Sequence, residues 1–136
     1  MPAADSRALV ERFLQAARER DLPVMRSLAA EDLRVIEAPS LPYGGEHVGL
    51  DAFLALSRTV FRQLGITELR IERIIAEGDT VVVLARIRGR AGARGEIFEM
   101  PIMELWVLRE GRIQEIQPFY WDTHSLLRLI GGAGEA

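Results

Sequence analysis

Between residues 67 and 121, apolar and polar side chains alternate along four consecutive segments of the chain. The segments are Thr67–Ala76, Thr80–Arg88, Ile97–Leu108 and Arg112–Trp121. They are joined by the sequences EGD, GRAGARG and REG, each of which contains glycine. A period of two is typical of β-strands, and short connections with glycine favour antiparallel neighbours. The sequence therefore predicts an antiparallel meander of four strands.

The first half of the chain instead has the three- and four-residue apolar spacing of helices. This spacing predicts one helix over Ser6–Arg20 and a short second helix that begins near Asp21 and Pro23. A third helix is expected to begin near Asp51 and to end at Gly65.

Between the second and third helices, Leu33–Ala38 predicts a further strand, and PSLPYGGEHVG predicts an ordered loop with little regular structure. Loops of this composition often border a pocket. At the other end of the chain, Thr123–Ile130 predicts a short helix or turn closed by Gly131 and Gly132.

The order of these elements predicts an α+β fold, with helices on one face of a sheet. A chain of 136 residues, with 49% apolar and 27% charged residues, fits one globular domain that spans residues 1–136. We expect about residues 1–5 and 131–136 to be flexible ends.

Composition excludes several classes of function. The net charge is −3 and the arginines are scattered, so a nucleic acid partner is not expected. The longest apolar runs, such as Val81–Ala85, are far too short to span a membrane. The absence of cysteine fits a cytoplasmic protein. Two histidines far apart and no phosphate-binding glycine pattern predict neither a metal site nor a cofactor.

The segment Ile97–Leu108 is apolar on both faces, which is unusual for a strand with one face in water. We expect a second subunit to cover the outer face, giving a homodimer, although burial of a central strand by its own chain would produce the same pattern. One face would carry Phe98, Met100, Ile102, Glu104, Trp106 and Leu108, and the other Ile97, Pro101, Met103, Leu105 and Val107.

Five short motifs occur in an order that resembles a known superfamily. They are ERFLQAARERD, RVIEAP, YGGEHVGLDAF, IAEGDTVVV and LREGRIQEIQPFYWDT. Together they resemble the nuclear transport factor two-like superfamily, in its SnoaL-like branch related to polyketide cyclases and steroid delta-isomerases, over nearly the whole chain. The resemblance implies a cone-shaped, curved, mostly antiparallel sheet. Three helices from the first half of the chain would pack on its concave face, around a deep pocket.

The resemblance also says which family residues are present. The oxyanion-binding tyrosine of the steroid isomerases falls on Phe13, and their general base falls on Ala38, so that pair of groups is missing. Glu104 falls where the isomerases have a protonated aspartate, and Trp121 matches a pocket tryptophan. The acid–base aspartate of the cyclases falls approximately on Asp122. The Arg-x-Asp motif of the related epoxide hydrolases does not occur.

Asp122 and Glu104 are the predicted catalytic residues, and each has a structural alternative. Asp122 can act as a proton carrier if an apolar pocket raises its pKa. If Asp122 instead caps the tail helix, the backbone N–H groups that it binds would lower its pKa. Glu104 interrupts an apolar strand face, so it is a buried acid or forms an ion pair with a neighbour such as Arg86. Glu37 is a reserve candidate only, because alternation points it away from Ala38.

These residues predict a mostly apolar pocket for an apolar small molecule. The function that follows is cofactor-free acid–base chemistry of the cyclase or isomerase type on a carbonyl compound. A non-catalytic ligand-binding or dimeric interaction domain is the alternative, in which the same residues are core or loop packing. The predicted lining residues are Phe13, Leu14, Tyr43, His47, Phe53, Val60, Ile102, Phe119 and Trp121.

Overall fold

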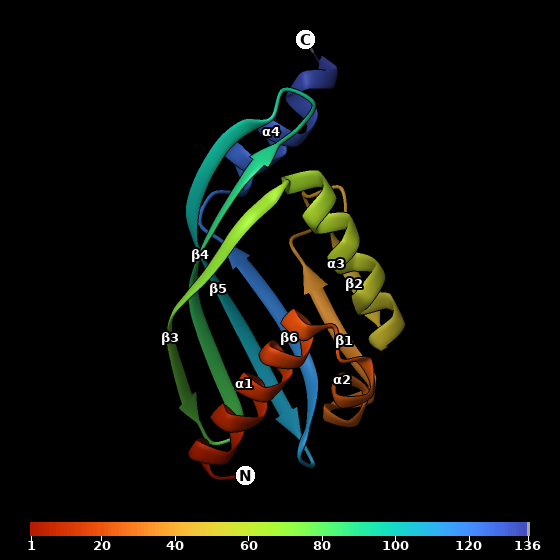
Figure 1. Cartoon of the computed structure of the whole chain (residues 1–136), viewed down its shortest axis with the longest axis vertical. Coiled ribbons are helices and arrows are strands. Elements are labelled where there is room, and N and C mark those ends of the chain that lie inside the picture. Colours follow the sequence, from red (N-terminus) through yellow and green to blue (C-terminus); the bar gives the residue numbers. More distant parts are fainter. Residues whose placement is uncertain (136) are drawn as a thin grey trace.

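The computed structural model describes residues 1–135 and confirms the α+β class, with the predicted helices and strands in the predicted order and one further strand before the third helix. Figure 1 shows a curved, unclosed sheet whose concave face holds the helices. The elements are α1 (Ala3–Glu19), α2 (Leu22–Leu28), β1 (Ala29–Glu37), β2 (Gly45–Val48), α3 (Leu50–Leu64), β3 (Ile66–Glu77), β4 (Thr80–Ala91), β5 (Glu96–Arg109), β6 (Arg112–Tyr120) and α4 (Thr123–Glu135).

The six strands of the described chain form one sheet in the order β2-β1-β6-β5-β4-β3. The predicted meander is confirmed, because β3, β4, β5 and β6 pair antiparallel in sequence order. Strands β1 and β6 run parallel, with Val35 opposite Ile116. Their carboxyl-terminal ends therefore lie at the same end of the sheet.

The core lies between the concave face of the sheet and the helices. Helix α1 contributes Val10 and Phe13, both fully buried. The Phe13 ring meets Phe53 of α3 and Trp106 of β5 edge to face, with both centroid distances at 5.6 Å. Edge-to-face contacts at this spacing are favourable for aromatic rings. These contacts fix α1 and α3 against the middle of the sheet.

Two segments differ from the sequence-based expectation. Gly45–Val48, expected within a loop, forms strand β2 because it pairs with the otherwise open edge of β1, from Arg34 to Glu37. Helix α4 does not end at Gly131 but continues to Glu135, since glycine inside a helix costs only about 1 kcal/mol relative to alanine. Of the expected flexible end, Ala136 lies outside the described residues.

The convex face of the sheet carries large apolar side chains. Met103 of β5 and Phe119 of β6 lie opposite each other in the register, and both are exposed. Ile75 and Ile97 are exposed as well. The predicted alternation of Ile97–Leu108 is therefore present, with one set of side chains in the core and the other set on the convex face.

Candidate functional site

The sheet register brings two carboxyl side chains to the concave face, on either side of β6. Glu104 of β5 lies opposite Pro118 of β6. Continuing the parallel β1–β6 register by two residues from Val35 and Ile116 brings Glu37 beside Pro118 on the other side. Neighbouring strands are about 4.8 Å apart, so the two glutamates are separated by the width of one strand.

Glu37 is buried on this face, with only 4% of its surface exposed. Its Oε1 atom has no hydrogen-bond partner among the described residues. Burial raises the pKa of Glu37 to about 8; the charge of Glu104 adds to the rise, and the Tyr120 hydroxyl partly opposes it. Glu37 is therefore mostly protonated at neutral pH.

The sequence had kept Glu37 only in reserve because alternation separates it from Ala38. Side chains do alternate along β1 in the structure, but the assumption that Ala38 points inward was wrong. Leu33, Val35 and Glu37 are the buried positions of β1, so the inward position is Glu37. The inward direction could have been read from Leu33 and Val35.

Glu104 lies on the concave face between Ile102 and Trp106, both of which are buried, while Glu104 itself is half-buried. Burial raises the pKa of Glu104, and a hydrogen bond from Trp106 Nε1 to its Oε1, at 3.3 Å, acts in the opposite direction. The alternative ion pair with Arg86 is wrong, because Arg86 contacts Glu99 instead, at 3.7 Å.

Two tyrosine hydroxyl groups lie beside the carboxyl pair. Tyr43, 5% exposed, belongs to the connection between β1 and β2, and its hydroxyl lies 3.1 Å from that of Tyr120, the last residue of β6. The His47 Nε2 atom is 2.9 Å from the Tyr43 carbonyl oxygen. Burial raises the pKa of both tyrosines, so both remain protonated hydrogen-bond donors.

Asp122 caps helix α4. Its Oδ1 atom accepts a hydrogen bond from the Ser125 backbone N–H at 3.0 Å, and its Oδ2 accepts one from the Ser125 hydroxyl at 2.6 Å. These bonds lower the pKa of Asp122. The geometry thus has the features of the cap, and a proton-carrying role for Asp122 stays a prediction.

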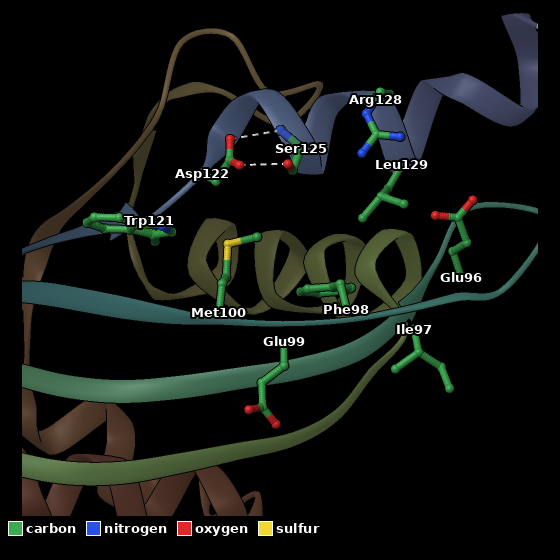
Figure 2. Close-up of a pocket in the computed structure, with 10 residues that line it drawn as sticks. All are labelled: Glu96, Ile97, Phe98, Glu99, Met100, Trp121, Asp122, Ser125, Arg128 and Leu129. Atoms are coloured by element: carbon green, nitrogen blue, oxygen red, sulfur yellow. Dashed lines mark hydrogen bonds between the residues drawn. The ribbon is translucent and has the colours of Figure 1, made fainter.

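Asp122 also borders a pocket of about 280 Å³ between α4 and the first residues of β5. In Figure 2, Phe98 and Met100 point from β5 toward α4, whereas Ile97 and Glu99 point away from it. The lining is mixed in chemistry and consists of Glu96, Ile97, Phe98, Glu99, Met100, Trp121, Asp122, Ser125, Arg128 and Leu129.

Two residues predicted to line the interior do not do so. Phe119 is 50% exposed on the convex face, and Trp121, just beyond the end of β6, is 78% exposed. The cause is a β-bulge opposite Val107 and Leu108, after which the inward residues of β6 are Ile116, Pro118 and Tyr120. Tyr120, which the sequence analysis missed, therefore takes the inward position that was expected of its neighbours.

The remaining predicted lining residues divide into core and margin. Phe13, Val60 and Ile102 are buried in the core, and Leu14 and Phe53 are partly buried against it. The last two, Tyr43 and His47, contact each other through the Tyr43 carbonyl oxygen and the His47 ring.

Within residues 1–135, no helix is long and apolar enough to cross a membrane. Across the same described part of the chain, no three or more His, Cys, Asp or Glu side chains form a group that could hold a metal ion.

The curved sheet with helices on its concave face defines a nuclear transport factor two-like (NTF2-like) cone. An NTF2-like protein from Burkholderia xenovorans LB400 has a TM-score of 0.85 at 24% identity, covering 96% of this chain and 98% of that one. A protein from Jannaschia sp. CCS1, provisionally named a SnoaL-like polyketide cyclase, has a TM-score of 0.77 at 22% identity, with coverages of 94% and 92%. TerC, crystallised with polyporic acid, has a TM-score of 0.78 at 21% identity, with coverages of 93% and 98%.

Within this class the sequence itself identifies the family. The model of the SnoaL-like domain matches residues 10–116, which is most of the chain. The chain therefore belongs to the SnoaL-like domain family. No curated protein matches it.

Proposed function

We propose that this protein is a small enzyme that carries out acid–base chemistry on an apolar carbonyl compound without a cofactor, using Glu104 and Glu37 as proton carriers. The observation that supports the proposal is the Glu37 carboxyl group on the concave face, which is buried, has a pKa of about 8 and has one oxygen without a hydrogen-bond partner within residues 1–135. Groups whose pKa lies near the working pH are the efficient proton carriers.

The two carboxyl groups have different roles in this proposal. Glu104 is given the role of the base in this proposal, because the hydrogen bond that it accepts from Trp106 opposes the rise that burial gives to its pKa. It removes a proton from the carbon next to the carbonyl group, and the electron pair moves onto the carbonyl oxygen to give an enolate. Glu37, still protonated, then gives its proton to another carbon of the enolate system. The substrate is isomerised with no net change in atoms or electrons, and a proton then passes from Glu104 through solvent to Glu37, which restores the starting state of the protein.

The proposal is tested by exchange of α-protons for deuterium, which detects proton removal whatever the final product. Polyketide-like and steroid-like ketones, with 2-tetralone as the first probe, are followed by ¹H NMR in D₂O. One positioned acid or base contributes roughly 10²–10⁴-fold in rate, so Glu104→Gln should slow exchange by that factor. Asp122→Asn, which preserves the cap, should leave the rate unchanged.

The opposite result for these variants would assign the active site to a different part of the molecule. If Asp122→Asn abolished exchange while Glu37→Gln and Glu104→Gln retained it, the chemistry would belong to the pocket at α4 and the carboxyl pair would be a structural feature. That outcome would support the catalytic role that the sequence predicted for Asp122.

A non-catalytic ligand-binding domain is the second candidate. It is favoured by the pocket of about 280 Å³ at α4, which lies outside the carboxyl pair, and by the polyporic acid crystallised with TerC. Binding of organic ligands without any exchange of their α-protons would favour this function over the first.

We also propose that the protein is a homodimer formed through the convex face of the sheet. The support is the exposed apolar pair Met103 and Phe119, which lies directly across β5 and β6, with Ile75 and Ile97 on the neighbouring parts of the sheet. Light scattering that shows a monomer at micromolar concentration would contradict the dimer.

A further inference from the structure

We infer that the pocket between α4 and β5 binds a small organic cation, an ammonium group carried on an apolar body. The ammonium group would lie over the Trp121 ring beside the Asp122 carboxylate, and the apolar body would cover Phe98 and Met100. The inference is separate from acid–base chemistry at the carboxyl pair. It rests on the ligand-binding function given above as the second candidate, and it names the class of ligand.

The pocket exists because α4 is held against β5 at both ends. At one end, the Trp121 backbone N–H donates to the Pro101 carbonyl oxygen at 3.1 Å. At the other end, a Cβ atom at Gly92 would overlap the Leu129 carbonyl oxygen, so α4 touches the connection between β4 and β5 there. A volume of about 280 Å³ remains between these contacts. Sites for small molecules measure roughly 300–1,000 Å³, so this pocket suits a ligand at the small end of that range.

The floor of the pocket is apolar. Phe98 and Met100 point from β5 toward α4 (Figure 2), and only 8% and 6% of their surfaces are exposed. Leu129 of α4, which also lines the pocket, packs against the same core. A ligand that covers these side chains removes apolar surface from water, which favours a ligand with an apolar body.

The charged side chains around the pocket leave one carboxylate uncompensated. Glu99 is paired with Arg86 and points away from α4 (Figure 2). Glu96 and Arg128 have opposite charges, and Figure 2 shows both toward the far end of the pocket from Trp121. Along α4, Arg128 is six residues beyond Asp122, a rise of about 9 Å. The charge that remains near Trp121 is therefore that of Asp122.

The Asp122 carboxylate is fixed in position and still has acceptor positions for a ligand. Hydrogen bonds from Ser125 lower the pKa of Asp122, so it is ionised at neutral pH. Each of its oxygens accepts one of these bonds and has room for a second. The amino-terminal end of a helix carries only about half a positive charge, so a full carboxylate leaves this end of the pocket negative.

The Trp121 ring supplies an aromatic face at the same end. The side chain is 78% exposed, although tryptophan is on average well buried in folded proteins. Of the aromatic side chains, tryptophan attracts cations most strongly over its ring. An anionic ligand would be repelled by Asp122, and a neutral ligand would gain little from either group. The combination therefore favours an organic cation.

The experiment compares two probes of the same shape, phenyltrimethylammonium and tert-butylbenzene, which differ by a charged nitrogen in place of a neutral carbon. Binding is measured by ¹H NMR as the full chain is added to a dilute solution of each probe, for the wild type, Trp121→Leu and Asp122→Asn. In the wild type, the methyl protons of the bound cation should show nuclear Overhauser effects to the Trp121 ring. Each substitution should weaken binding of the cation roughly fivefold.

The neutral probe controls for folding and packing. Its affinity should be the same in Asp122→Asn as in the wild type, and it should change much less than that of the cation in Trp121→Leu, because leucine keeps an apolar side chain there. Glu99→Gln is the matched control for charge, since it removes a carboxylate that points away from α4. It should leave the affinity for the cation unchanged.

The inference would be overturned by a wild type that does not bind phenyltrimethylammonium, or by an affinity for it that is unchanged in Trp121→Leu or in Asp122→Asn. An equal loss in Glu99→Gln would overturn it as well, because the attraction would then come from overall charge.

Failure of the ligand-binding function is a separate result. If the wild type binds tert-butylbenzene but not the cation, ligand binding stands and the cation assignment does not. If neither probe binds, both are wrong. Exchange of α-protons at the carboxyl pair is independent of these outcomes, because that pair lies outside the pocket at α4.

Discussion

Replacing Glu37 by glutamine should make the protein more stable at neutral pH. The substitution keeps the size of the side chain and removes an ionisable group that is 96% buried, as its 4% exposure implies. In the folded protein the pKa of Glu37 is about 8, against 4.5 for an ordinary glutamate. The unfolded chain therefore releases a proton that the folded chain keeps.

These two pKa values determine how the free energy of unfolding changes with pH, and over which pH range. Below pH 4.5 the carboxyl group is protonated in both states, so it contributes no pH dependence. Between pH 4.5 and about 8 the unfolded state is favoured by a further ~1.4 kcal/mol for each pH unit. At pH 7 the accumulated cost is about 3 kcal/mol, and above pH 8 it stays constant.

Urea unfolding at several values between pH 5 and pH 8, at one protein concentration, measures this difference. The free energy of unfolding should fall with pH more steeply in the wild type than in Glu37→Gln, so that the variant gains up to about 3 kcal/mol at pH 7. Glu31→Gln, which changes an exposed glutamate of the same strand, is the matched control. Parallel curves for the wild type and Glu37→Gln would refute the argument that Glu37 is buried and protonated.

Three further predictions concern the helix cap, a close backbone approach and the convex face. Asp122→Ala should lower the Tm at pH 7, whereas Asp122→Asn should preserve it. The difference in Tm between Asp122→Ala and the wild type should become smaller at acidic pH. The pKa of Asp122 is lowered in the folded protein, so the stability that its carboxylate provides is lost when the carboxylate takes up a proton. Gly65→Ala should destabilise the protein by about 2 kcal/mol or more in urea unfolding, because Gly65 has φ of 55° and a Cβ atom there would overlap the Arg90 carbonyl oxygen. Phe119→Glu should give a monomer by light scattering, whereas Ser27→Glu on α2 should leave the dimer intact; a monomeric wild type would remove the basis of this prediction.

The sequence predicted the fold better than it predicted the site, and the reason lies in how each depends on register. Predicting the fold requires only that each segment be identified as a helix or a strand. Within β5, the alternation of side chains also correctly placed Glu104 on the same face as Ile102 and Trp106. Which residue of β6 faces inward depends on a bulge that no local pattern in the sequence marks. One extra residue in a strand moves every later side chain to the other face.

The neighbours of Glu37 and Tyr43 could not be predicted from the sequence, because they depend on how the strands pair. The inward direction of β1 is visible in Leu33 and Val35, but the approach of Glu37 to Glu104 exists only because β1 pairs with β6. The contact of Tyr43 with a residue 77 positions later in the chain depends on the same pairing.

Under the proposed function, the parallel pairing of β1 with β6 would let substrate admission and chemistry be varied separately. Both strands finish at one end of the cone, so the connection to β2 and the turn into α4 leave the sheet from neighbouring strands. Under that function, residues of these two segments other than Tyr43 would be free to change, while Glu37, Glu104 and Tyr120 stay fixed in the sheet register. For protein engineering, the proposed function would make this end of the molecule an exchangeable entrance, where loops transplanted from relatives change the choice of substrate without rebuilding the groups that move the proton.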